Sequence, residues 1–115
     1  IILTSKNNSS GSTNILAHLS SRPNTVTIGE KTGGSAEGPT AGVLFFLTLP
    51  ESGAKLRIPM FRQWNNTESF EEGMGVTPQI DAPMTVKAFI EGRDPALEQA
   101  ISMVERKAIA LNERR

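Results

Sequence analysis

Apolar and polar positions alternate along the chain in a way that predicts strands separated by helices and loops. Residues 1–4 form an apolar run typical of a buried strand. Residues 15–19 form a second, mostly apolar run whose composition favours a helix. Pro23 ends this helix within residues 20–24, because proline disfavours helical backbone at the residue before it. Residues 25–28 are β-branched throughout, which favours a second strand. This order predicts two parallel neighbouring strands joined by a right-handed helical crossover.

A long loop and a hairpin are predicted next. Residues 29–42 are rich in Gly, Thr and Ser, and loops of this length are usually functional or mobile. Residues 43–49 have the composition of a strand, which turns at residues 50–53. Residues 55–60 alternate polar and apolar side chains, so we expect them to pair antiparallel with that strand. Residues 63–74 are polar and irregular.

A long amphipathic helix is predicted from Asp94 onward. Asp94 is a favoured N-cap residue, and Pro95 is favoured at the first helical position. Apolar side chains then recur at steps of three to four residues, which predicts the face that packs against the domain. These side chains belong to Leu97, Ile101, Val104, Ala108 and Leu111.

The composition excludes several classes of function. The chain has 115 residues with 12 Lys+Arg and 12 Asp+Glu, so no global field would recruit nucleic acid. It has no Cys, which excludes disulfides and thiolate chemistry. Its single His has no carboxylate partners at ligand spacing. We therefore expect no metal and no other cofactor.

The apolar run at residues 1–4 also bears on domain organisation. A continuous apolar strand expects neighbours on both of its faces. We therefore expect residues 1–115 to be part of a larger domain, whose upstream sequence packs on this strand. Without that sequence, the exposed face should stay apolar, exchange elements or make the chain a homo-oligomer.

The most informative local feature is a serine turn between the first strand and the first helix. A serine at a helix N-terminus lies beside unpaired backbone N–H groups, which favour negative charge on an oxygen. Ser9, Ser10 and Ser12 compete for this role. Only Ser10 is followed by Gly11, whose backbone N–H would stay open to an oxyanion. The alternative is that these serines are simply helix N-caps.

The turn is followed by a strand that runs into a glycine-rich loop. Gly33, Gly34 and Ser35 lie in this loop, where a peptide could approach the backbone closely, and we take them as substrate-binding candidates. Four motif blocks follow one another along the chain, at residues 3–6, 10–13, 26–34 and 75–79. In this order they resemble the C-terminal-processing (tail-specific) serine peptidases, and more closely their tricorn-like branch.

The resemblance implies a fold, an activity and a set of residues. The fold would be α/β, a ClpP/crotonase-like mixed sheet with flanking helices. This chain would be the C-terminal part of the catalytic domain that has this fold. Ser10 would be the nucleophile and Gly11 part of the oxyanion hole, with Glu72, or else Glu71, as a supporting acid. The chain departs from the family at Gln79, where the closing signature has an acid. A solvent-exposed acidic turn is an equally good interpretation of the two glutamates.

The general base is missing from the expected places. His18 lies eight residues after Ser10, roughly 12 Å along a helix, which is too far for a hydrogen bond. The lysine of the tail-specific branch would fall on Ser35, which excludes a simple Ser–Lys dyad. The tricorn-like branch instead implies a histidine from upstream sequence.

Two functions follow from the sequence. The first is a serine endopeptidase that cleaves peptides or proteins near the C-terminus, in the cell envelope, the periplasm or a secreted form, as the resemblance implies. Its substrate would lie extended along a strand edge. The second is a non-catalytic binding or assembly domain with the same fold.

Overall fold

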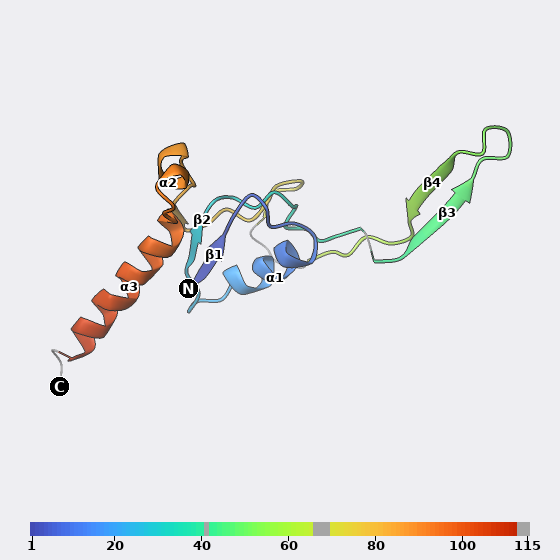
Figure 1. Cartoon of the computed structure of the whole chain (residues 1–115). Coiled ribbons are helices and arrows are strands. Elements are labelled where there is room, and N and C mark those ends of the chain that lie inside the picture. The colour runs from blue at the N-terminus through green and yellow to red at the C-terminus, as the bar shows by residue number, and fades with distance from the viewer. Residues whose placement is uncertain (41, 66–69, 113–115) are drawn as a thin grey trace.

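The computed structural model describes residues 1–40, 42–65 and 70–112 (Figure 1). It combines helices with two small sheets, which confirms the predicted α/β class. The elements in chain order are β1 (Ile2–Thr4), α1 (Gly11–Ser20), β2 (Thr27–Gly29), β3 (Leu44–Thr48), β4 (Lys55–Pro59), β5 (Ile80–Asp81), α2 (Val86–Ile90) and α3 (Pro95–Asn112).

The three-stranded sheet has the order β1-β2-β5, and both pairs are parallel. Leu3 pairs with Ile28, and Ile28 pairs with Ile80, so β2 is the central strand and is buried throughout. The sheet therefore contains the predicted parallel pair, β1 and β2, and α1 connects these two strands along the chain. The short strand β5 and the helix α2 were not predicted, because two and five residues carry too little periodicity.

Two apolar clusters form the core. One joins α1 to the glycine-rich loop through Leu16, Ala17, Ala36 and Val76. The other joins α3 to the sheet, and its buried members are Ile28, Ala96 and Ala100. The first cluster therefore packs α1 against the loop that follows β2, and the second packs α3 against the central strand of the sheet.

The helix α3 forms where predicted but packs through a different face. The Asp94 carboxylate accepts hydrogen bonds from the Ala96 and Leu97 N–H groups, both at 3.1 Å, which confirms the N-cap. The predicted contact residues Leu97, Ile101 and Val104 are instead 46%, 49% and 58% exposed.

The small side chains on the neighbouring face explain this difference. Ala96 and Ala100 let α3 approach the sheet closely, and Met103 packs beside them. The prediction from hydrophobicity gives large side chains more weight than alanine. It therefore assigned the contact to the wrong face of the helix. The side chains of Ala108 and Leu111 lie outside the described residues.

The hairpin β3–β4 is antiparallel, as predicted, with Phe45 opposite Ile58 and Leu47 opposite Leu56. It projects away from the three-stranded sheet as an arm, on the opposite side from α3 (Figure 1). These four side chains share one face, because opposite residues in a ladder point the same way. All four are exposed.

The strand β1 lies at the edge of its sheet. Ile1 and Leu3 are 52% and 42% exposed, and with Ile101 and Val104 of α3 they line an apolar groove of about 280 Å³. The expected apolar face at residues 1–4 is therefore present. No helix among the described residues has the length and apolar character needed to span a membrane.

Candidate functional site

Ser10 has an unusual backbone conformation. Its φ is 52° and its ψ is −122°, and it is the only non-glycine residue with positive φ in the described ranges. This conformation is unfavourable for a residue with a Cβ and costs about 1–3 kcal/mol. Strain of this kind is concentrated at functional sites, and a sharp strand-to-helix turn is one way of exposing a nucleophilic serine.

The structure distinguishes the three competing serines. Ser12 Oγ donates to the Ser9 carbonyl at 2.9 Å and accepts from the Ser9 N–H at 3.0 Å, so this hydroxyl closes the turn. Ser10 occupies the N-cap position of α1, yet among the described residues its side chain makes no capping hydrogen bond. The N-cap alternative therefore accounts for the position of Ser10 and leaves its hydroxyl without a structural role.

Gly11 is the first residue of α1 and is exposed. The first N–H groups of a helix have no partner within the helix, so the Gly11 N–H is available to a bound group. A Cβ built at Gly11 meets no atom within 4 Å. The positive end of the α1 dipole lies at the same point and favours a developing oxyanion.

The glycine-rich loop packs directly against the serine turn. A Cβ at Gly33 would lie 2.3 Å from the Lys6 carbonyl oxygen. A Cβ at Gly34 would lie 2.7 Å from Ser9 Cα and 2.7 Å from Thr13 Oγ1. The Gly34 N–H also donates to the Asn8 carbonyl at 3.0 Å. These two glycines therefore support the turn.

Ser35 has a different position from the two glycines. It lines a pocket of about 510 Å³ together with Ser10, and a volume of this size suits a small ligand or a short stretch of peptide. The structure thus brings together the proposed nucleophile and one of the three substrate-binding candidates. The other lining residues are Glu37, Gly38, Pro39, Thr40 and Arg62.

Glu37 is the residue that the sequence interpretation missed. It is buried, with 8% of its surface exposed, and accepts the Gly73 N–H at 2.5 Å. Its other carboxylate oxygen forms an ion pair with Arg62, which lies after β4. A single Glu in a Gly/Ser-rich loop gives no sequence signal of its own, because its partner lies in a distant segment.

The two segments that carry this ion pair are joined by backbone hydrogen bonds. The Asn65 N–H donates to the Glu37 carbonyl at 2.6 Å, and the Gln63 N–H donates to the Pro39 carbonyl at 3.1 Å. The Asn65 side chain, itself buried, donates to the Ala36 carbonyl at 2.7 Å. These hydrogen bonds join residues 36–39 to residues 63–65. They hold the wall of the pocket at the base of the β3–β4 arm.

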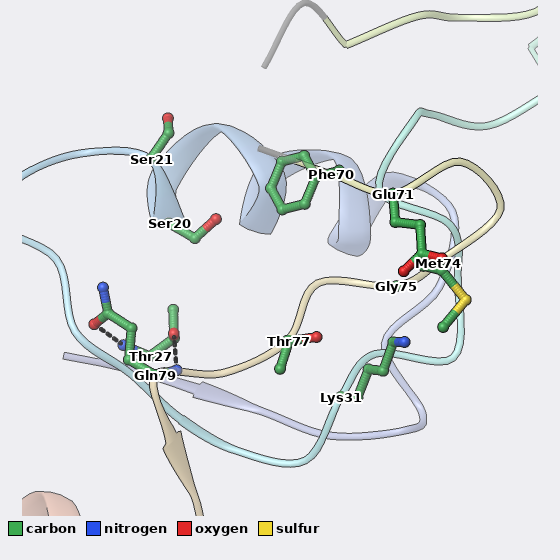
Figure 2. Close-up of a pocket in the computed structure, with 10 residues that line it drawn as sticks. All are labelled: Ser20, Ser21, Thr27, Lys31, Phe70, Glu71, Met74, Gly75, Thr77 and Gln79. Atoms are coloured by element: carbon green, nitrogen blue, oxygen red, sulfur yellow. Dashed lines mark hydrogen bonds between the residues drawn. The ribbon is translucent and has the colours of Figure 1, made fainter. Parts of the chain in front are cut away.

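The predicted accessory acids lie elsewhere. Glu72 is exposed and does not line the pocket that contains Ser10. Glu71 lines a second pocket of about 350 Å³, together with Lys31 and Thr77 (Figure 2). A supporting role for Glu72 therefore stays a prediction, whereas Glu37 is the carboxylate at the Ser10 pocket.

Gln79, which replaces the acid of the closing signature, has a structural role. Its N–H donates to Thr27 Oγ1 at 3.0 Å, and its side-chain oxygen accepts the Thr27 N–H at 3.4 Å (Figure 2). These bonds tie the start of β2 to the segment before β5.

His18 is exposed on α1. Within the described ranges, no group of three or more His, Asp or Glu residues is placed to hold a metal ion.

No protein-family model matches the chain, and a comparison with curated proteins finds no significant match.

Proposed function

We propose that this chain is the nucleophile-bearing, C-terminal part of a serine peptidase catalytic domain with a ClpP/crotonase-like fold. The observation that carries the proposal is the strained backbone of Ser10 at the start of α1, with a hydroxyl that caps nothing in the described structure. The parallel pair β1–β2 and the pocket shared by Ser10 and Ser35 support it.

The proposed reaction is acyl transfer. Ser10 Oγ attacks the carbonyl carbon of the scissile peptide bond, and its proton passes to a general base. The Gly11 N–H and the α1 dipole stabilise the oxyanion that forms. The C–N bond then breaks as the base returns the proton to the leaving amine, and water hydrolyses the acyl-enzyme by the reverse sequence.

The general base comes from upstream sequence of the same protein in this proposal. His18 is exposed and stands on a later turn of α1 than Ser10. The apolar groove formed by Ile1, Leu3 and Ile101 supports packing of further sequence beside β1. The substrate is a peptide or protein cleaved near its C-terminus, and the enzyme is proposed to act in the cell envelope, in the periplasm or as a secreted protein, as the resemblance implies.

A non-catalytic binding or assembly domain is the second candidate. It is favoured by the exposed position of Glu72 and by the use of Gln79 as a structural tie to Thr27. A domain that had lost the chemistry would keep the pocket without a reactive serine.

Labelling with a fluorophosphonate, which traps activated serines, separates the two candidates. The full-length native protein should be labelled at one position, Ser10, as located by mass spectrometry of the tryptic peptides. Ser10→Ala should abolish labelling, whereas Arg57→Gln should retain it, because Arg57 belongs to the exposed strand β4 and does not line the pocket. A full-length protein that folds but takes no label would support the binding domain.

A further inference from the structure

The Ser10 pocket presents a cation and buries an anion. Glu37 and Arg62 are the charged residues among those that line it. The side chain of Glu37 is 8% exposed, whereas the side chain of Arg62 is 46% exposed. A ligand that enters the pocket therefore meets the guanidinium of Arg62 rather than the carboxylate of Glu37.

Two contacts restrain the orientation of the Arg62 guanidinium. One edge pairs with the Glu37 carboxylate, and the Arg62 Cζ lies 4.9 Å from the centroid of the Trp64 ring. Contact with an aromatic face favours a cation and limits the planes that the group can adopt. A guanidinium has five N–H donors, so the edges turned away from Glu37 can donate to a second acceptor.

The charge of Glu37 is balanced from two directions. Its second oxygen accepts the Gly73 N–H at 2.5 Å, so Arg62 shares the task of stabilising this buried carboxylate. The positive end of α1 faces the same pocket at Ser10. The field at the pocket mouth therefore favours negative groups, although the ion pair itself is neutral.

We propose that Arg62 is a specificity residue that binds a carboxylate of the peptide placed at Ser10. A planar carboxylate is the natural ligand for a guanidinium held by stacking, because it accepts two parallel N–H bonds. The ligand class is a peptide whose carboxylate lies within a few residues of the bond that is attacked. This inference rests on the proposed function, since it places the substrate at Ser10.

Two sources can supply that carboxylate: the C-terminus of the peptide or an Asp or Glu side chain. Calorimetric titration of the full-length Ser10→Ala protein distinguishes them, since this variant binds without turnover. The probes are three unstructured alanine-rich peptides of equal length. One has a free C-terminus, one is amidated, and one is amidated with a Glu near its end.

The expected result is that at least one carboxylate peptide binds about tenfold or more tightly than the plain amidated peptide. Arg62→Gln should remove this difference, and Arg62→Lys, which keeps a charge but not the planar fork, should reduce it. Arg57→Gln is the matched control, because Arg57 belongs to the exposed strand β4 and does not line the pocket. It should leave the difference unchanged.

The outcomes separate this inference from the proposed function. Equal binding of all three peptides, or a preference that survives in folded Arg62→Gln protein, overturns the inference while fluorophosphonate labelling of Ser10 still stands. A carboxylate preference that depends on Arg62 without any labelling of Ser10 overturns the peptidase and leaves a peptide-binding pocket. If Arg62→Gln fails to fold by circular dichroism, the Arg62→Lys comparison decides.

Discussion

The backbone of Gly34 lies directly against Ser10. A Cβ placed at Gly34 would be 3.1 Å from the Ser10 nitrogen, and closer still to Ser9 and Thr13. Gly34 therefore determines how tightly the loop can support the strained turn. The position of Ser10 therefore depends on a residue 24 positions later in the chain.

We therefore expect Gly34→Ala to disturb both stability and reactivity. The added methyl group must displace backbone at Ser9, which should cost about 1–3 kcal/mol of unfolding free energy. Fluorophosphonate labelling of Ser10 should fall as well. Gly11→Ala is the control for stability, since the same methyl group meets no atom within 4 Å there. Equal urea midpoints for the two variants would show that the loop does not support the turn.

The strain at Ser10 predicts that a substitution at the nucleophile can stabilise the protein. Ser10→Gly should be more stable than Ser10→Ala by about 1 kcal/mol, because glycine adopts positive φ without penalty. Both variants lack the hydroxyl and should be inactive in the full-length protein. Denaturant unfolding with unchanged slopes measures the difference. A less stable Ser10→Gly variant would mean that the turn is relaxed.

The two acids should respond differently to neutralisation. Glu37→Gln keeps an acceptor for the Gly73 N–H but removes the charge paired with Arg62, so it should cost about 2 kcal/mol. Glu72→Gln, at an exposed position, should stay within about 0.5 kcal/mol of wild type.

Activity provides a second comparison between the same variants. If Glu72 supports the site, Glu72→Gln should lower the rate of peptide hydrolysis less than Ser10→Ala does, because an orienting acid contributes less than the nucleophile. Full activity in Glu72→Gln together with a large loss in Glu37→Gln would move the supporting role to Glu37.

The local features of this fold could be predicted from the sequence, and the long-range ones could not. The β-branched run at residues 25–28 predicted a strand, which the structure has two residues later at its start, and the Asp94–Pro95 start signal predicted the beginning of α3 correctly. The burial of Glu37 depends on Arg62 and Gly73, and no local pattern contains a pairing between segments so far apart. The prediction of the packing face of α3 was wrong for a related reason. Ala100 is buried because it packs against Ile28, which lies far away in the sequence.

The start of α3 carries an ion pair with a predictable pH dependence. Arg93 Nε and Nη2 donate to the two carboxylate oxygens of Glu98 at 2.8 and 2.6 Å, and these bonds lower the pKa of Glu98. A lowered folded-state pKa gives stability that is present above the unfolded pKa and is lost as pH falls through the folded one. Arg93→Gln should remove this contribution.

The measurement compares urea midpoints of wild type and Arg93→Gln from neutral pH into the acidic range below the usual pKa of glutamate. The difference should be small, because both side chains are exposed, and should vanish at the acidic end. A difference that stays constant across this range would assign the effect of Arg93 to something other than its pairing with Glu98.

The contact face of α3 can be tested by introducing the same charge at adjacent residues. Ala100 is 9% exposed and faces Ile28, so Ala100→Glu would bury an unpaired carboxylate and should cost about 3 kcal/mol or more. Ile101 is 49% exposed, so Ile101→Glu should destabilise this chain by only about 1 kcal/mol. In the full-length protein, where we propose that upstream sequence packs beside β1, Ile101→Glu should become clearly more destabilising. Thermal unfolding of both variants in both forms measures these effects, and an Ile101→Glu variant that is neutral in the full-length protein would contradict the proposed packing.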